Sequence, residues 1–215
     1  MGGLDEFLAP GEYIDSGHPS VRAFAREHVR GESDVERGVS LYYAVRDGVR
    51  YNPFLDFTDN SAFRGSQCLV SGEGFCVGKA ALLAACARAE GIPARVGFAD
   101  VKNHLTTPRL AERMGSDLFI YHGFTELFLD GRWVKATPAF NLALCERFRV
   151  KPLEFDGRND SIFHPFDADD RRHMEYLRYR GSFADVPADE IQNAFREVYP
   201  GLYELGREAN KEVFG

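Results

Sequence analysis

The sequence predicts an α+β fold, in which helices pack on one side of a small antiparallel sheet. Two observations predict it. Helical periodicity dominates the first 90 residues, and residues 121–137 have the pattern of a β-hairpin. The hairpin strands are rich in β-branched and aromatic residues, and they meet at Asp130-Gly131, a preferred dipeptide for two-residue type I′ turns.

The predicted elements follow in chain order. They are a helix over 21–29, a helix over 34–48, an extended segment over 49–53, a loop over 53–73, a helix over 77–90, a strand over 93–101, a short helix near 108–114, the hairpin strands over 121–129 and 132–137, and helices near 188–198 and 201–213.

The first two helices are predicted from apolar spacing and capping. Val21, Phe24, Ala25 and Val29 recur at the spacing of one helix face. Ser33 stands three residues before Glu36, which is the capping-box spacing at the start of a helix. The segment 53–73 that follows is rich in Gly, Ser, Asp and Asn. A loop of this length inside a domain is usually functional.

The helix over 77–90 is apolar on every side, which predicts burial, and it ends before Gly91 and Pro93. The strand over 93–101 and the hairpin come next. Beyond residue 150 the pattern loosens, until Pro187 and two acidic residues mark the start of another helix.

Composition excludes several classes of protein. A formal net charge of -7 argues against nucleic-acid binding, which usually needs a basic face. No targeting segment is expected, and no apolar run approaches the roughly 18 residues of a membrane helix. The four cysteines form no CxxC pair. We therefore expect reduced thiols in the cytoplasm, and neither a metal nor a cofactor.

Cys76 and His122 are the candidate catalytic pair. Cys76 stands at the predicted start of the apolar helix, where the helix dipole favours a thiolate. His122 stands near the start of the hairpin, and the two side chains can meet in space although they are far apart in sequence. An imidazole beside a thiol can take its proton and later protonate the leaving group.

Four stretches resemble the transglutaminase-like superfamily, relatives of the papain-like cysteine proteases. They are Tyr42 to Pro53, Gly74-Phe75-Cys76 with Lys79-Ala80, Ala87 to Arg95, and His122 to Val134. The resemblance spans about residues 40–140 and implies the papain-like transglutaminase-core fold, with Cys76 as nucleophile and His122 as its base.

One departure concerns the third member of the site. The family usually has Asp at the position of Thr137, so the resemblance leaves Thr137 or Asn141 to orient His122. By analogy with papain-like enzymes, Gln67 is a candidate to stabilise the oxyanion.

The resemblance predicts a core over 34–150, preceded by a lead-in segment over 1–33 and followed by a loop-rich, helical extension over 151–215. It also implies thiol-based acyl transfer or hydrolysis on a peptide or side-chain amide, with hydrolysis favoured over cross-linking. One alternative is a non-catalytic binding module that keeps the cleft. Another is a redox-sensing thiol, for which Cys68 is the resolving partner nearest in sequence.

Overall fold

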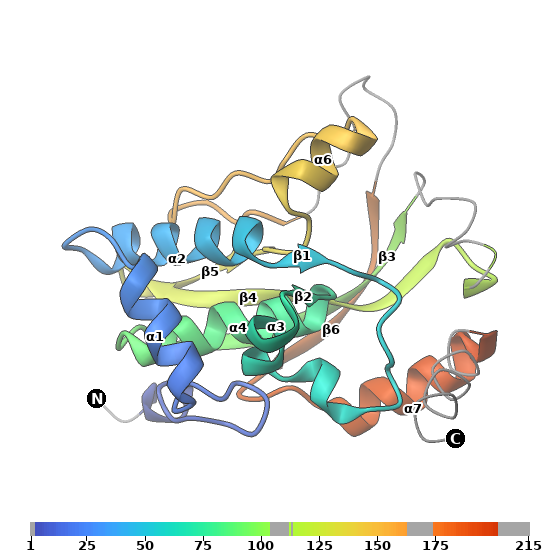
Figure 1. Ribbon diagram of the computed structural model, residues 1–215, viewed down its shortest axis with the longest axis horizontal. Helices are drawn as coiled ribbons and strands as arrows, with labels where there is room; N and C mark the ends of the chain where they lie inside the picture. The colour runs from blue at the N-terminus through green and yellow to red at the C-terminus, as the bar shows by residue number, and fades with distance from the viewer. Residues whose placement is uncertain (1–2, 104–111, 113, 163–173, 202–215) are drawn as a thin grey trace.

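A computed structural model of the chain describes residues 3–103, 112, 114–162 and 174–201 (Figure 1). Its elements, in chain order, are η1 (Asp5–Phe7), α1 (Pro19–His28), α2 (Asp34–Gly48), β1 (Arg50–Tyr51), η2 (Asn60–Phe63), α3 (Gly65–Ser71), β2 (Glu73–Gly74), α4 (Cys76–Ala89), β3 (Ala94–Asn103), β4 (Leu118–Leu129), β5 (Arg132–Ala136), α6 (Leu142–Phe148), β6 (Met174–Phe183) and α7 (Ala188–Val198).

The main sheet has four antiparallel strands in the order β5-β4-β3-β6, and β1 and β2 form a separate parallel pair. The predicted hairpin is confirmed: Asp130 and Gly131 have φ of +49° and +81°, the positive values that a type I′ turn requires. In Figure 1, α1 to α4 lie on one side of this sheet. The α+β fold is therefore confirmed.

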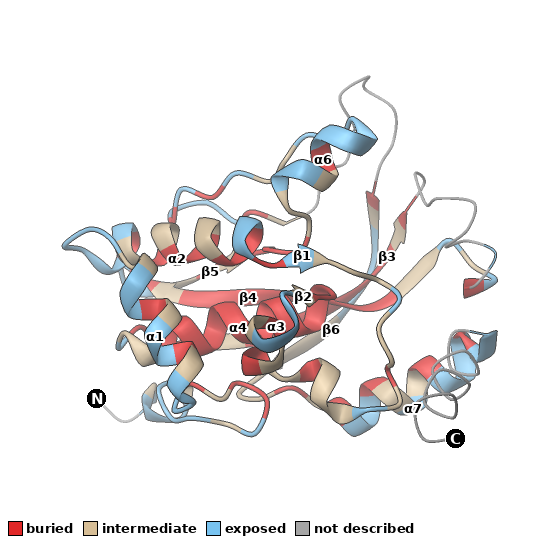
Figure 2. Cartoon of the chain, in the orientation of Figure 1, coloured by how far each residue is buried: buried red, intermediate tan, exposed pale blue. Residues whose placement is uncertain are grey.

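Helix α4 lies at the centre of the core. Thirteen of its 14 residues are buried, and it packs between β4 on one side and α1, α2 and α3 on the other. Figure 2 shows the buried residues concentrated along α4 and the strands behind it. Although α4 is strongly apolar, it is short, and the described residues contain no helix with the length and hydropathy to span a bilayer.

Two further predictions for the helices are confirmed. The capping box of α2 is present, with the Ser33 hydroxyl accepting the Glu36 N–H and the Glu36 carboxylate accepting the Ser33 N–H. Helix α7 spans Ala188–Val198, as its acidic first turn predicts. The expected helix near 108–114 falls largely, and the one over 201–213 almost entirely, outside the described residues.

The prediction of a single loop over 53–73 is wrong, because this segment contains η2, α3 and the start of β2. Contacts from distant residues stabilise the short helix α3. The Asp15 carboxylate accepts the N–H of Ser66 in its first turn, and a Cβ on Gly65 would lie 3.0 Å from the Leu82 Cα. Such contacts leave no periodic signal in the local sequence.

Helix α6 and strand β6 were also not predicted. Strand β6 pairs with β3 along the edge of the main sheet, so residues beyond 151 contribute to that sheet as well as to loops and a helix. Its buried and exposed residues do not alternate, and its register with β3 shifts twice, which removes the period of two that identifies a strand.

The N-terminal segment is bound to the C-terminal part of the chain. The Asp185 carboxylate accepts backbone N–H groups from Glu12 at 2.6 Å, from Ile14 at 2.8 Å and from Tyr13. Arg88, at the end of α4, donates to the carbonyl oxygens of Ala9, Ala94 and Ala184. Contacts therefore cross both predicted boundaries, 33/34 and 150/151, and the division into segments stays a prediction.

We expect Asp185→Asn to lower the free energy of unfolding by about 2 kcal/mol, because an amide NH₂ would face backbone N–H groups that now donate to a carboxylate. Urea denaturation measures this change. Glu197→Gln, at an exposed position of α7, is the control and should change stability by less than about 0.5 kcal/mol. Equal stabilities of the two variants would contradict the role of Asp185 in holding the N-terminal segment.

Candidate active site

Cys76 is the first residue of α4, and its side chain is 8% exposed. Strand β2 ends at Gly74 and Phe75 is the helix N-cap, so the chain turns from strand into helix just before the thiol. The first turn of α4 lies directly against β4. A Cβ on Gly123 would lie 3.0 Å from the Val77 Cα, so this close approach requires glycine.

His122 immediately precedes that glycine on β4 and is 3% exposed. The preceding residue, Tyr121, has φ of +51°, and the β3–β4 register shifts here. Such a bulge re-aims neighbouring side chains. Asp100 stabilises it by accepting the Tyr121 N–H at 3.1 Å and the Arg180 Nε–H at 2.6 Å. Sequence patterns did not single out Asp100 or Arg180, because the residues that they support lie on other strands.

Cys76 and His122 line the same pocket, whose empty volume is about 420 Å³ with the open solvent at its mouth included. The structure thus brings the predicted pair together. The other described lining residues are mostly apolar or aromatic: Tyr51, Pro53, Phe57, Phe75, Met114, Phe119, Ile120, Phe195 and Tyr199. Several of them come from α7 and from the segment after β1.

The surroundings of the Cys76 thiol act on its pKa in two directions. Burial raises its pKa to about 11, although hydrogen bonds from the backbone N–H groups of Gly123 and Val77 act in the opposite direction. The N–H groups at the helix N-terminus thus favour the thiolate, as expected, but desolvation outweighs them and favours the neutral thiol. Deprotonation of Cys76 requires a base close to the sulfur.

Thr137 directly follows β5, and its side chain is buried. Ala136 pairs with Thr125, so continued alternation puts Thr137 on the face of β4 that carries Phe124 and His122. Within the described part of the chain, its Oγ1 has no hydrogen-bond partner. A buried hydroxyl in that state is uncommon and needs an explanation.

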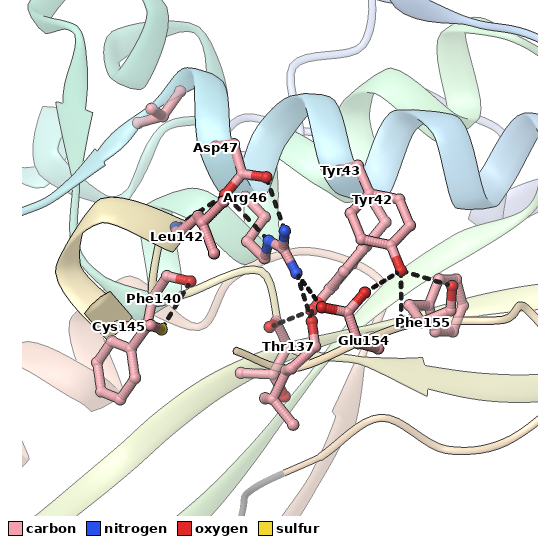
Figure 3. Close-up of polar contacts among 12 residues, drawn as sticks. Tyr42, Tyr43, Arg46, Asp47, Thr137, Phe140, Leu142, Cys145, Glu154 and Phe155 are labelled. Atoms are coloured by element: carbon pink, nitrogen blue, oxygen red, sulfur yellow. Dashed lines mark hydrogen bonds and ion pairs between the residues drawn. The ribbon is translucent and has the colours of Figure 1, made fainter. Parts of the chain in front are cut away.

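Hydrogen bonds from α2 hold the segment around Thr137 (Figure 3). The Tyr42 hydroxyl lies 3.2 Å from the Thr137 carbonyl oxygen and 2.9 Å from that of Leu153. Arg46 donates to the Leu153 carbonyl at 2.7 Å and pairs with Asp47, which in turn accepts the Leu142 N–H at 2.9 Å. The backbone that carries Thr137 and the start of α6 is thus attached to the end of α2.

Asn141 is the N-cap residue of α6, and its Oδ1 accepts the Tyr51 N–H at 3.1 Å. Tyr51 lines the pocket, so Asn141 supports the pocket wall through the backbone of β1. Both candidates for the third member of the site therefore lie on one short segment, and the choice between Thr137 and Asn141 stays open.

Gln67 lies on α3, where it is half-buried, and it is not among the described residues that line the pocket. Its role at the oxyanion stays a prediction. Cys68 is the resolving partner in the redox alternative. It is buried against Gly74 and Gly78 and is not among the described residues that line the pocket. Both Cys68 and Cys76 are free thiols.

Comparisons with known proteins identify the family of the chain. A family description, the transglutaminase-like superfamily, matches residues 22–138, which is more than half of the chain. The chain belongs to the transglutaminase-like superfamily. No curated protein matches it.

Two solved structures are similar to the chain. "A Putative Cysteine Protease from Cytophaga hutchinsonii" shares 18% identity at a TM-score of 0.50, over 85% of this chain and 55% of that one. "A Putative Protease from Parabacteroides distasonis" shares 18% identity at a TM-score of 0.37, over 62% of this chain and 25% of that one. The chain thus spans about half the length of the Cytophaga protein, and this likeness concerns the fold.

We expect iodoacetamide to label Cys76 more slowly than a free thiol at pH 7, with a rate that rises towards the raised pKa of about 11. His122→Ala should slow labelling at pH 7 by about tenfold or more, because the base is lost, and have little effect at pH 11, where hydroxide removes the proton. Mass spectrometry of each cysteine measures these rates. Cys86, with no exposed surface, is the internal control. A labelling rate that levels off below pH 8 would instead mean that the resting pair is ionised.

Proposed function

We propose that this protein is a cysteine hydrolase that cleaves a peptide or side-chain amide through an acyl-enzyme. Cys76 is the nucleophile and His122 the general base and acid. The observation that carries the proposal is the shared pocket, in which a thiol at a helix start and a strand histidine meet. Membership of the transglutaminase-like superfamily supports the same thiol chemistry.

The proposed reaction starts from a neutral thiol. His122 accepts the proton as the sulfur attacks the amide carbon, and the carbonyl electron pair moves to oxygen. When the tetrahedral intermediate collapses, the C–N bond breaks and the nitrogen takes the proton from His122, so the amine leaves. Water then attacks the thioester while His122 accepts its proton. The C–S bond breaks, the acid leaves, and His122 returns the proton to the sulfur.

The raised pKa of Cys76 is compatible with this order of events. A thiolate that formed before substrate binding would be desolvated, with backbone N–H groups and His122 as its polar neighbours in the pocket. Proton transfer that accompanies attack avoids that state. A substrate carbonyl near the sulfur therefore determines when the nucleophile forms, and a buried thiol is protected from other electrophiles until then.

Thr137 is the first candidate to orient His122. Its hydroxyl can accept an imidazole N–H, and its buried Oγ1 has no hydrogen-bond partner among the described residues, His122 included, so the proposed bond to His122 belongs to the reaction. Asn141 is the second candidate, because the Oδ1 that accepts the Tyr51 N–H retains another lone pair. Both provide a neutral acceptor where the family usually has a carboxylate, so we expect weaker stabilisation of the imidazolium.

We further propose a reducing compartment such as the cytoplasm, since the four cysteines are free thiols. A second candidate function is a binding module that keeps the pocket without efficient chemistry. The raised pKa of Cys76 and the neutral Thr137 favour it. Turnover decides between the two functions, because only the hydrolase forms an acyl-enzyme.

We expect the protein to release amines from a mixture of fluorogenic peptide amides and to lose this activity in Cys76→Ala. Intact-mass spectrometry after rapid acid quenching should show an acyl adduct on Cys76. Cys145→Ala, which removes a buried thiol outside the described lining of the pocket, is the matched control and should retain activity. Activity that persists in Cys76→Ala would refute the proposal. Peptide binding without turnover would support the binding module.

We expect Thr137→Val to lower kcat by roughly tenfold to a hundredfold if the hydroxyl orients His122, because misplacing a catalytic group by a small distance has effects of this size. It should leave the melting temperature unchanged or higher, because the hydroxyl makes no hydrogen bond to the described residues in the resting structure, and its proposed bond to His122 belongs to the reaction. Asn141→Ala should lower the melting temperature, because it removes the acceptor of the Tyr51 N–H. Full activity in both variants would place the third member elsewhere.

A further inference from the structure

We propose that the pocket beside Cys76 selects substrates whose side chain next to the scissile carbonyl is uncharged and apolar, with aromatic and large aliphatic groups preferred. The inference names the substrate class of the proposed hydrolase and so rests on that function. Three features of the pocket support it: the residues that line it, the arrangement of its aromatic rings, and the hydrogen bonds that hold those rings in place.

The described lining contains no Asp, Glu, Lys or Arg side chain. Apart from Cys76 and His122, it consists of aromatic and aliphatic side chains from β1, the segment after it, the start of α4, β4 and the α7 region. A pocket with one reactive pair and otherwise apolar walls is typical of a site that recognises an apolar group.

Aromatic rings form a continuous wall from the nucleophile to α7. The centroid of the Phe57 ring lies 4.8 Å from that of Phe75, the residue before Cys76, and 5.5 Å from that of Phe195. The Phe195 ring in turn lies 5.5 Å from that of Tyr199. All three contacts are edge-on or tilted, and edge-to-face packing is an arrangement that aromatic rings prefer. The wall therefore presents ring carbons to a group bound beside Cys76.

Hydrogen bonds hold the two parts of the wall together. Gln192 on α7 donates through Nε2 to the Phe57 carbonyl oxygen at 2.8 Å. Figure 1 shows the segment after β1 descending to η2 beside α7. The Tyr199 hydroxyl accepts the Ile120 N–H at 2.7 Å and donates to the Leu118 carbonyl at 2.6 Å. Its polar atom is therefore already used by β4, and the remaining ring surface is apolar.

These contacts determine which substrates bind. An apolar side chain gains free energy when it leaves water for such a pocket, whereas a carboxylate or ammonium loses its hydration without a counter-charge in the described lining. A lysine amine as acyl acceptor faces the same cost while it is protonated. The lining thus also favours water as the acceptor, which is hydrolysis.

Alkylation of Cys76 tests the pocket independently of hydrolysis. N-phenethyl-iodoacetamide is compared with its N-(2-carboxyethyl) and N-(2-aminoethyl) analogues, each rate being divided by the rate with glutathione. We expect the phenethyl reagent to react at Cys76 about tenfold or more faster than both charged reagents. Equal rates, or a faster charged reagent, would overturn the inference.

Variants of Phe195 relate the selectivity to the aromatic wall. Phe195→Glu introduces a carboxylate and should shift the preference towards the aminoethyl reagent by about tenfold. If that variant does not fold, Phe195→Ala is the second test: it should reduce the phenethyl preference several-fold when each rate is divided by the rate of iodoacetamide labelling of Cys76 in the same variant. Phe148→Ala is the matched control: this residue of α6 is 43% exposed, is not among the described lining, and should leave the preference unchanged. An unchanged preference in a folded Phe195 variant would overturn the inference.

A series of amide substrates that differ only in the residue on the acyl side tests the apolar selectivity separately from the proposed hydrolase activity. We expect kcat/KM for Phe and Leu to exceed that for Asp and Lys by about tenfold or more. Turnover with equal or higher values for the charged residues would support the hydrolase and refute the selectivity. Selective alkylation without turnover of any amide would refute the hydrolase and leave the apolar pocket supported.

Discussion

The close packing of the first turn of α4 against β4 is the constraint on which the rest of the structure depends. Gly123 allows the helix to approach the strand, and the Thr125 hydroxyl donates to the Ala80 carbonyl at 2.8 Å one turn further along. Lys79, fully buried on the same helix, donates to the carbonyl oxygens of Arg46 at 2.8 Å and Val49 at 2.5 Å at the end of α2. Burial lowers the pKa of Lys79 to about 7, so this ammonium is held at a cost in solvation. Together these contacts determine where Cys76 lies relative to His122.

The same packing explains why the pKa of the Cys76 thiol is raised. A helix that is buried on all sides has a buried N-terminus, and desolvation there outweighs the N–H groups that would stabilise a thiolate. The aromatic wall contributes to that desolvation. The proposed selectivity would have the same physical origin, because both follow from an apolar environment around one thiol and one imidazole.

The site also depends on polar contacts far from the pocket. Tyr42 and Arg46 on α2 position the segment that carries Thr137 and Asn141, and Asp100 stabilises the bulge that precedes His122. None of these three residues has a periodic or motif signal that identifies its role in the sequence. The partners in these three contacts, Thr137, Leu153 and Tyr121, are 21 or more positions away along the chain, so only the fold brings each donor to its acceptor. The same holds for Thr137, the candidate third member. Its position after the hairpin identifies it in the sequence, but the sequence does not show which groups surround its side chain.

The sequence by itself determined the features that depend on local chemistry. These are the capped helix over 34–48, the apolar helix behind Cys76, the Asp130-Gly131 hairpin and the pair Cys76 and His122. Each follows from residue spacing or from a motif a few residues long. Only the tertiary structure decided the direction of the Cys76 pKa, the aromatic lining of the pocket, the place of β6 in the sheet and the short helix α3. The physical reason is that burial, desolvation and strand pairing arise from residues distant in the chain, and no local pattern contains that information.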